Sequence, residues 1–367
     1  MDIVITHNLL CARGGAEKVI LEIAKKFEPV AIYVLRYDKE GTYPEFSEFN
    51  VVEMGAPRGS LLVGPVGASK FYGMKIREDY DVVNAHWPPS HWVRNRNPGC
   101  VWYCHSPSRA VYDLYDYRMG GFSLPVKLGH YFYSKAYRAV DRRVCSGLEH
   151  IFANSRNVQG RISKYLGQES EVLYPGVDYD EYECRDYDKY FFLPGRIDPT
   201  KRIEYVISAF NEFRKTHGDF RLVIAGSLDE KFRWYYEKIK SIFDGEILLN
   251  VDSYKMLELY SNCYCVLFSG MDEDFGITPL EGMACSKPVI SVNEGGPRET
   301  VVDGKTGFLV GDAASMARRM GELADDFGLA ERMGRAGRLR VRAMFSWDVF
   351  LRRFGAVCRD VADRTCG

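Results

Sequence analysis

Several absences narrow the class of this protein. The sequence has no run of eighteen apolar residues, so no membrane-spanning helix is expected. Its first residues, MDIVITHNLL, contain neither a basic leader nor a cleavage site, which disfavours a secretion signal. The net charge is −1, whereas nucleic-acid-binding proteins more often have a strong basic excess, so no nucleic-acid partner is expected. We therefore expect a cytoplasmic protein.

Motifs for metal and redox chemistry are also missing. The ten cysteines are scattered, and the close pair Cys263 and Cys265 has the spacing of neither a zinc site nor a redox pair. No HExxH motif occurs, and no His/Cys spacing fits a metal site. DYD triplets at 178–180 and 186–188 resemble a sugar-nucleotide metal motif, but they lie in an aperiodic stretch. The sequence thus predicts buried reduced thiols, no metal and no cofactor.

A length of 367 residues suits two domains. Hydrophobic residues make up 46% of the sequence and charged residues 27%, which indicates a globular fold. Short apolar runs alternate with segments of helical periodicity, which is typical of parallel sheets covered by helices. The expected strands are DIVITHNLL, VAIYVL, DVVNAH, CVWYCH and HIFANS, then YFFLPG, FRLVIAG, GEILL, CYCVLF, KPVISV and TGFLV.

A stretch rich in Pro, Gly, Asp and Tyr separates the two sets of strands. We expect an N-terminal Rossmann-like domain over residues 1–173, a linker over 174–189 and a second Rossmann-like domain over 190–345. The fold class is therefore α/β, with two doubly wound domains. Ligands of such sheets bind beyond the carboxyl ends of the strands.

Two cations follow the first strand of the second domain. In PGRIDPTKRI the strand ends at Gly195, and Arg196 and Lys201 come before the next helix. A guanidinium and an ammonium at the carboxyl end of a strand can hold a diphosphate, although surface charge is the ordinary explanation for an isolated pair.

Two glycines open the first helix. Gly14 and Gly15 in RGGAEK allow backbone N–H groups to approach an anion at a helix N-terminus. The segment is neither a full GxGxxG nor a Walker motif, and a tight turn explains it almost as well.

The segment EDFGITPLEG raises a question about helix capping. Thr278 is a suitable cap, Pro279 suits the first helical position, and Glu281 completes the spacing of a capping box. A carboxylate such as Glu281 can also accept hydrogen bonds from a ribose diol.

The same helix start can bind an anion. Gly276, Ile277 and Thr278 can present free N–H groups to a phosphate. Glu273 lies outside the helix, so capping does not explain it. A carboxylate beside a phosphate site would repel a second anion. We therefore expect the partner of Glu273 to be a sugar.

His105 ends a strand of the first domain, with Arg109 close behind it. A lone histidine is usually structural, but its place at a strand end makes a polar site plausible. His86 and His91 in NAHWPPSHW compete for the role on similar grounds.

Together these segments resemble the retaining glycosyltransferases of family four, which have the GT-B architecture. The resemblance rests on RGGAEK, YCHSP, ANSRNVQGRI, YPGVD, GRIDPTKRI, LVIAG, the E-x7-E run from Glu273 to Glu281, and GGPRETVVDGKTGFLV. These motifs occur in the expected order over nearly the whole chain. The resemblance implies two domains facing a central cleft, with a C-terminal helix, residues 346–367, that packs back on the first domain.

The resemblance also implies roles for individual residues. His105 and Glu273 would contact the reacting sugar, while Glu281 would hold the ribose. The donor phosphates and sugar would be bound by Arg196, Lys201, Gly14, Gly15, Gly276, Ile277 and Thr278. Arg109 is a candidate for acceptor binding.

The segment YCHSPSRAVYDLY resembles mannosyltransferases of polysaccharide and lipid-linked glycan assembly, which favours GDP-mannose as donor and a glycan or lipid-linked glycan as acceptor. UDP-glucose and UDP-N-acetylglucosamine remain alternatives, as do a sugar-nucleotide epimerase and a non-catalytic sensor. Residues of HYFYSKAYRAVDRR could serve a peripheral contact with the inner membrane surface, and a buried amphipathic helix explains them equally well.

Overall fold

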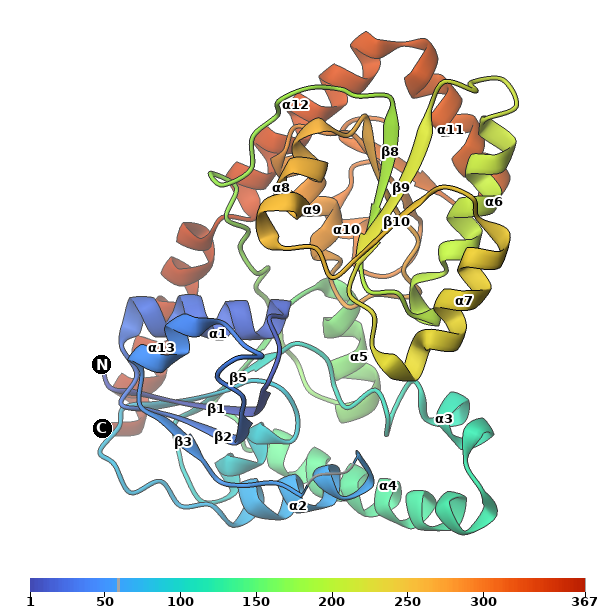
Figure 1. Ribbon diagram of the computed structural model, residues 1–367. Helices are drawn as coiled ribbons and strands as arrows, with labels where there is room; N and C mark the ends of the chain where they lie inside the picture. The colour runs from blue at the N-terminus through green and yellow to red at the C-terminus, as the bar shows by residue number, and fades with distance from the viewer. Residues whose placement is uncertain (58–59, 367) are drawn as a thin grey trace. The chain divides into compact units, whose positions relative to one another are not determined.

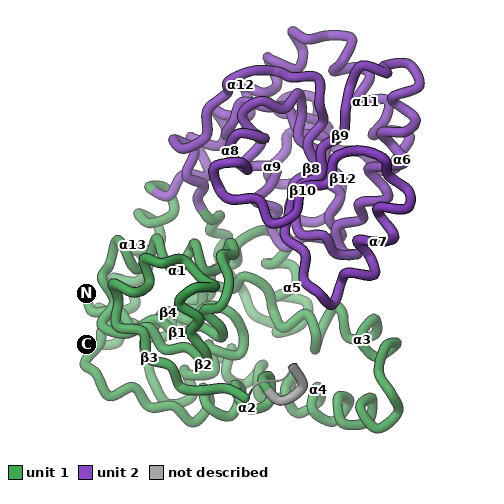
Figure 2. Tube along the Cα trace, in the orientation of Figure 1, with its two compact units in different colours: residues 1–175, 348–367 green, residues 176–347 purple. Residues whose placement is uncertain are grey.

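The computed structural model describes residues 1–57 and 60–366. The chain divides into two compact units (Figures 1 and 2). The first unit contains Met1–Pro175 and returns for Asp348–Gly367, and the second contains Gly176–Trp347. Gly367, the last residue of the expected C-terminal helix, lies outside the described residues.

The first unit is built on a parallel sheet with the strand order β3-β2-β1-β4-β5-β6-β7. The order reverses between β1 and β4, which is the switch point of a doubly wound sheet. Its strands are β1 (Ile3–Leu10), β2 (Ala31–Tyr37), β3 (Val51–Glu53), β4 (Val82–Ala85), β5 (Cys100–Cys104), β6 (His150–Ala153) and β7 (Glu171–Val172).

Helices cover both faces of this sheet: α1 and α13 lie on one side, and α2 and α4 on the other (Figure 1). The helical elements of the unit are α1 (Gly15–Phe27), η1 (Pro44–Glu48), α2 (Ser60–Gly73), η2 (Ser90–Asn95), α3 (Tyr115–Gly121), α4 (Leu124–Cys145), α5 (Arg156–Leu166) and α13 (Trp347–Cys366).

The second unit repeats this plan with the strand order β10-β9-β8-β11-β12-β13, again all parallel. Its switch point lies between β8 and β11. The strands are β8 (Tyr190–Pro194), β9 (Arg221–Gly226), β10 (Glu246–Leu249), β11 (Cys265–Phe268), β12 (Val289–Val292) and β13 (Gly307–Val310).

Its helices connect successive strands, as parallel pairing requires. They are η3 (Pro199–Lys201), α6 (Ile203–Phe213), η4 (Glu230–Phe232), α7 (Arg233–Ile242), α8 (Ser253–Asn262), α9 (Ile277–Ala284), α10 (Pro297–Thr300), α11 (Ala313–Asp325) and α12 (Phe327–Met344). The apolar side of α6 packs with α7 and α11 in one core that contains Val206, Phe210 and Met320.

The central strands are apolar on both faces because helices bury both faces of a parallel sheet. All residues of β4, β5 and β11 are buried. This explains why the continuous apolar runs predicted these strands. The short strands β3 and β7, at the edges of the first sheet, were not predicted.

The segment 174–189 contains no helix or strand. Within the first unit, α13 brings Phe350 and Phe354 into the core, where Phe354 packs against Phe27 and Phe350 against Tyr103. Arg353 of the same helix forms a bidentate ion pair with Glu171, at 2.6 and 2.9 Å.

No helix within residues 1–57 and 60–366 combines the length and the apolar character needed to cross a bilayer.

Candidate active site

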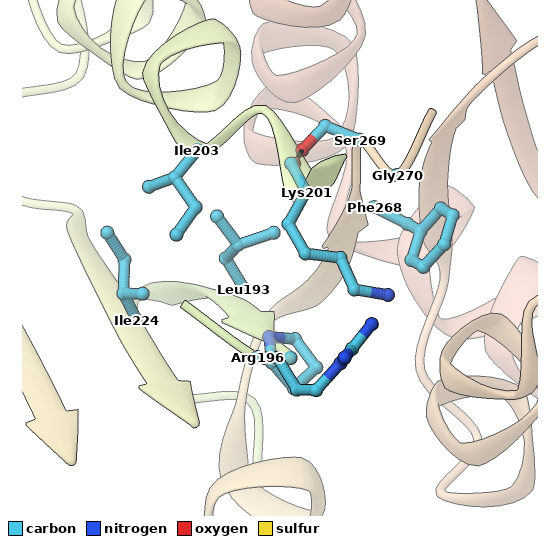
Figure 3. A pocket seen from close by; sticks show the side chains of 10 residues that line it. Leu193, Arg196, Lys201, Ile203, Ile224, Phe268, Ser269 and Gly270 are labelled. Carbon is cyan, nitrogen blue, oxygen red and sulfur yellow. Dashed lines mark hydrogen bonds between the residues drawn. The ribbon is translucent and has the colours of Figure 1, made fainter. Parts of the chain in front are cut away.

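A pocket opens in the second unit at the carboxyl ends of β8 and β11 (Figure 3). We call it the β8 pocket. Its lining residues are Leu193, Pro194, Gly195, Arg196, Lys201, Ile203, Ile224, Phe268, Ser269 and Gly270. The guanidinium of Arg196 and the ammonium of Lys201 point toward the same side of it. The structure thus brings together the two cations that the sequence singled out.

The loop after β8 is shaped by close backbone packing. Gly195 has φ +144°, and a Cβ on Gly226 would lie 1.7 Å from the Gly195 carbonyl oxygen, so neighbouring strands approach too closely there for a side chain. Asp198 then caps η3, its Oδ1 accepting from the Thr200 N–H at 2.9 Å. This cap fixes the turn that carries Lys201.

The two cations have different surroundings. Lys201 is largely buried, and its Nζ donates to Glu273 Oε1 at 2.7 Å. Arg196 is 67% exposed, and its guanidinium lies 3.4 Å from the Asp198 carboxylate. Lys201 is therefore held in place by its partner, whereas Arg196 can swing into solvent. Glu273, which helix capping did not explain, is the acid that balances Lys201.

The predicted capping box is wrong. Helix α9 begins at Ile277 after Gly276, which has φ +79°, and no side chain caps it. Glu281 instead accepts hydrogen bonds from Tyr260 at 2.5 Å and Tyr182 at 3.3 Å. Glycine adopts this left-handed conformation easily. The helix therefore begins at Ile277, before the Pro279 that the sequence pattern indicated as its first residue. Its first N–H groups have no side-chain cap.

Glu281 is partly buried between these tyrosines. Burial raises the pKa of its carboxyl, while the hydrogen bonds from Tyr260 and Tyr182 act in the opposite direction. The carboxylate is thus oriented by two phenols before any ligand arrives, and it can still accept further hydrogen bonds through its remaining lone pairs.

In the first unit, Gly14 and Gly15 lie at the start of α1. Gly14 is the N-cap, and no side chain bonds to the first N–H groups. A Cβ on Gly14 would lie 2.5 Å from Glu17 Oε2, so the Glu17 carboxylate folds back beside this glycine. Glu17 also approaches His7 Nε2 at 3.6 Å. An acid therefore lies beside the glycines that were predicted to approach an anion.

His105 follows β5 and belongs to a buried group of imidazoles, the histidine cluster, formed by His7, His86 and His105. His105 is 5% exposed, and its Nε2 lies 3.1 Å from His86 Nδ1. Burial lowers the pKa of His105 to about 3, and neighbouring His7 adds to the effect. His105 is consequently a neutral imidazole near pH 7.

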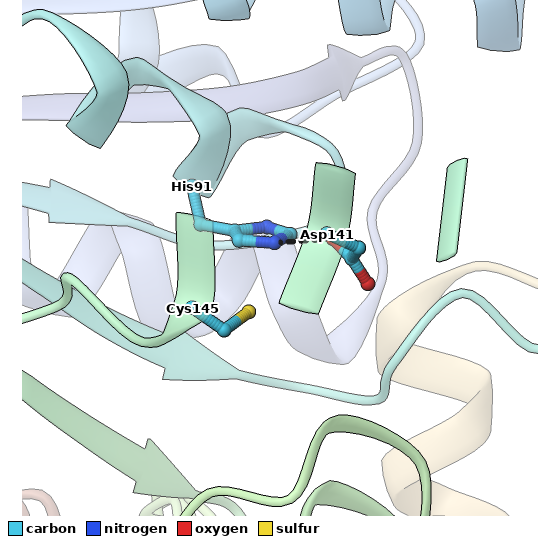
Figure 4. Close-up of side chains that lie close together, drawn as sticks. All are labelled: His91, Asp141 and Cys145. Atoms are coloured by element: carbon cyan, nitrogen blue, oxygen red, sulfur yellow. Dashed lines mark hydrogen bonds and ion pairs between the residues drawn. The ribbon is translucent and has the colours of Figure 1, made fainter. Parts of the chain in front are cut away.

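Of the two competing histidines, His86 contacts His105 and His91 belongs to a separate network (Figure 4). His91, Asp141 and Cys145 are the one trio of candidate metal ligands within the described part of the chain. The Asp141 carboxylate already accepts from His91 at 2.8 Å, Trp92 at 2.6 Å and Tyr112 at 2.9 Å. Burial also raises the pKa of the Cys145 thiol, which opposes the thiolate that a metal needs. These contacts account for the trio as a structural network.

Arg109 is anchored within the first unit. Its Nε donates to Asp113 Oδ2 at 2.8 Å, and Arg161 approaches the same carboxylate at 3.9 Å. Arg161 also donates to the Ser106 hydroxyl at 3.2 Å. The strand end that carries His105 is thus tied to Arg109 through Ser106, Arg161 and Asp113.

Two protein-family models match successive parts of this chain. The model described as Glycosyltransferase Family 4 matches residues 13–181, and the model described as Glycosyl transferases group 1 matches residues 180–340. The chain is a glycosyltransferase.

Relatives and solved structures agree with this assignment. The glycosyltransferase is 25% identical to the alpha-1,3/1,6-mannosyltransferase ALG2 of Dictyostelium discoideum, with 98% of each chain covered. Its fold resembles the GT-B structure of Anabaena Alr3699/HepE with UDP and glucose, at TM-score 0.76 and 17% identity over 98% of this chain and 100% of that one. Sucrose-phosphate synthase from Thermosynechococcus elongatus has the same TM-score and identity, over 98% and 99%.

The predicted residues of this glycosyltransferase fall into two groups. Arg196, Lys201, Glu273, Gly276 and Glu281 lie in the second unit. Ile277 and Thr278 lie there too, and the remaining predicted residues lie in the first unit: Gly14, Gly15, His105 and Arg109.

Sequence reasoning missed the partners that orient the predicted residues. Tyr260 and Tyr182 hold Glu281, and His86 with Asn84 holds His105. One signal was available, because NAH and YCH both end expected strands of one domain. The ends of parallel neighbouring strands lie at the same edge of the sheet.

Proposed function

We propose that this glycosyltransferase moves mannose from GDP-mannose to a glycan or lipid-linked glycan acceptor, with retention of configuration and without a metal. The similarity to an alpha-1,3/1,6-mannosyltransferase of Dictyostelium discoideum supports mannose as the transferred sugar. The β8 pocket carries the proposal, because Arg196 and Lys201 both point into it from the carboxyl end of a strand. Two cations suit the two charges of a donor diphosphate.

The pairing of Lys201 with Glu273 supports a sugar next to that diphosphate. In a nucleotide sugar, the hexose is bonded directly to the second phosphate. Groups that bind the two parts must therefore be adjacent, and Lys201 Nζ and Glu273 Oε1 are 2.7 Å apart. We assign Lys201 to the phosphate and Glu273 to sugar hydroxyls. Glu281, oriented by two tyrosines, is assigned to the ribose diol.

The proposed reaction breaks the bond from the anomeric carbon to the phosphate oxygen and forms a bond from the same carbon to the acceptor oxygen. The acceptor proton passes to the departing phosphate. Negative charge grows on the diphosphate, so Arg196, Lys201 and the uncapped N–H groups of α9, at Gly276, Ile277 and Thr278, stabilise the transition state more than the ground state. Gly14 and Gly15 would assist at the phosphate, and His105 would contact the reacting sugar.

The proposal includes contact with an anionic membrane surface through α4. Leu124, Leu128 and Phe132 recur every four residues on this helix and are 80%, 59% and 62% exposed. The helix also carries the cations Lys127, Lys135, Arg138, Arg142 and Arg143. Its one acidic residue, Asp141, is buried. An exposed apolar stripe flanked by cations matches the interface of an anionic bilayer.

Nucleotide release tests the proposed donor. The purified enzyme is incubated with GDP-mannose, UDP-glucose or UDP-N-acetylglucosamine, with and without a lipid-linked glycan. We expect GDP release that depends on both GDP-mannose and acceptor. If only a UDP-sugar supports nucleotide release, that sugar nucleotide replaces GDP-mannose as the donor. An isomerised sugar nucleotide without acceptor would identify an epimerase, and binding without turnover a sensor.

Vesicle sedimentation tests the membrane contact. We expect the enzyme to sediment with phosphatidylserine vesicles more than with phosphatidylcholine vesicles, and the Leu128→Ser/Phe132→Ser variant to lose this binding. Trp234→Ser, at an exposed apolar residue of the second unit, is the matched control. Equal sedimentation of both variants would contradict a role for α4. A cytoplasmic location remains a prediction.

A further inference from the structure

Asn84, His86 and His105 form a buried hydrogen-bonded chain at neighbouring strand ends. Asn84 lies on β4, His86 follows that strand directly, and His105 follows β5, its neighbour. His86 Nε2 lies 2.7 Å from Asn84 Oδ1, and His86 Nδ1 lies 3.1 Å from His105 Nε2. Asn84 and His86 are fully buried. The proposed function assigns no role in the reaction to either of them.

The Asn84 amide determines which nitrogens donate and which accept along these hydrogen bonds. Its Nδ2 donates to the Val101 carbonyl at 3.3 Å, so its Oδ1 faces His86. A carbonyl oxygen can only accept, and His86 Nε2 must therefore carry a hydrogen. The amide orientation thus selects the tautomer of His86.

Both imidazoles are neutral, and each has only one N–H group to give. Burial lowers the pKa of His86 well below its usual value, and the pKa of His105 falls to about 3 for the same main reason. With its hydrogen on Nε2, His86 offers a lone pair at Nδ1. His105 Nε2–H donates to that lone pair, which leaves His105 Nδ1 as an acceptor.

We propose that Asn84 and His86 are positioning residues that hold the His105 imidazole in its Nε2–H tautomer, so that Nδ1 accepts a hydrogen bond from a hydroxyl of the transferred sugar. The second half of this statement rests on the proposed function, which places His105 at the reacting sugar. The first half concerns the protein alone.

Backbone contacts keep the two rings from turning away. The His86 N–H donates to Ser90 Oγ at 3.1 Å, and Trp102 Nε1 donates to the His86 carbonyl at 2.6 Å. Asn154 Nδ2 donates to the His105 carbonyl at 3.0 Å. The imidazoles of His86 and His105 stack with 26° between their planes. Each residue is therefore fixed at its backbone as well as at its ring, through both nitrogens in His86 and through Nε2 in His105.

A neutral acceptor suits the chemistry of glycosyl transfer. Positive charge develops at the anomeric carbon as the donor bond breaks, and an imidazolium beside it would oppose that charge. The fixed lone pair of a neutral imidazole can instead accept a hydrogen bond from a sugar hydroxyl without adding charge. Within the described part of the chain, His7 from β1 and Tyr103 from β5 are titratable side chains packed against the two rings, and Glu17 from α1 lies beside His7.

Nitrogen NMR tests the positioning role directly. Long-range ¹H–¹⁵N spectra of the full-length enzyme, labelled with ¹⁵N-histidine, distinguish protonated from unprotonated ring nitrogens. His105→Gln assigns the His105 signals. We expect a protonated Nε2 and an unprotonated Nδ1 for His105 at pH 7. His86→Phe keeps a ring but removes the acceptor, and it should abolish the preference. His86→Gln supplies a carbonyl acceptor and should retain it.

Kinetics then tests the link to the reaction. We expect kcat of His86→Phe to fall about 10- to 100-fold, the range that one misdirected buried hydrogen bond covers, with KM for the donor nearly unchanged. His86→Gln should recover part of this loss. His217→Gln is the matched control and should leave kcat unchanged, because His217 lies in the second unit, where it pairs with Asp325 outside the proposed site. Thermal unfolding of each variant shows whether it is folded.

Different results would overturn different parts. An Nδ1–H tautomer of His105 in the wild-type enzyme, or an unchanged tautomer in a folded His86→Phe variant, would overturn the positioning role. Wild-type kcat in His86→Phe with the tautomer lost would overturn its role in transfer. Failure of the wild-type enzyme to transfer any sugar would refute the proposed function while leaving the spectroscopic result intact.

Discussion

The candidate sites of the two units handle charge in opposite ways. The second unit gathers charged groups, with Lys201 paired to Glu273 and the exposed Arg196 nearby. The first unit gathers imidazoles in a buried cluster, where His86 and His105 stay neutral. This contrast separates a site of the second unit, whose cations suit the ionic diphosphate of the proposed donor, from a buried site of the first unit, whose imidazoles carry no charge. It also predicts which substitutions should act through charge.

The largest effect is expected for Lys201→Ala. Removing an ammonium that is largely buried and held in place should lower kcat/KM about 10²- to 10³-fold, as for the loss of one fixed donor in an oxyanion site. Steady-state nucleotide release measures this change. Lys215→Ala, which removes an exposed ammonium, is the control. A near-normal rate in Lys201→Ala would remove the assignment of the β8 pocket to the diphosphate.

A smaller loss, about tenfold, is expected for Arg196→Ala. Its guanidinium is more exposed than the Lys201 ammonium, so water screens its charge more strongly. The rate difference between this variant and the wild-type enzyme should shrink as salt increases, and the same assay over a salt series measures it. A loss that exceeds the Lys201→Ala effect would reverse the order of the two cations.

The pH dependence of stability should have opposite signs in the two sites. The folded-state pKa of His105 lies near 3, below its unfolded value, so this residue costs stability as the pH falls from about 6.5 toward 3. The pKa of Glu281 is raised in the folded state, so this residue costs stability as the pH rises above about 4.3, its unfolded value. Urea unfolding of His105→Gln and Glu281→Gln between pH 4.5 and 6.5 tests both signs.

Relative to the wild-type enzyme, His105→Gln should gain stability toward the acidic end of this range, and Glu281→Gln should gain toward the neutral end. His217→Gln serves as the control. Parallel pH profiles for the two variants would show that the contrast between the sites does not extend to their stability.

No effect is expected from chelation. Proposed stabilisation of the diphosphate by Arg196, Lys201 and the N-terminus of α9 needs no divalent ion, so activity should persist in excess EDTA. The same nucleotide-release assay measures it. A complete loss of activity that Mg²⁺ or Mn²⁺ restores would contradict the proposed metal-free mechanism.

Much of the fold was readable from the sequence because its central strands are buried on both faces. Apolar runs such as CVWYCH and CYCVLF predicted β5 and β11 within two residues. The strand β7 has only two residues, too few for any pattern to emerge. Local reading also failed at α9, where the positive φ of Gly276 moved the helix start.

The orientation of the site residues was harder to predict from the sequence. Tyr182 and Glu281 are 99 residues apart in the chain, and Lys201 and Glu273 are 72 apart. Strand ends can show that residues share an edge of a sheet, as for His86 and His105. They do not give the contacts between side chains, because those depend on loops and rotamers that local patterns leave open.

The return of α13 to the first unit has a consequence for biosynthesis. Phe350 and Phe354 complete a core whose other members, including Phe27 and Tyr103, are translated first. Between them lies the whole of the second unit, Gly176–Trp347, which takes on the order of 10 to 30 s to synthesise. During that interval the nascent first unit has an open apolar face, and chaperones that shield such faces at the ribosome have time to act before α13 covers it.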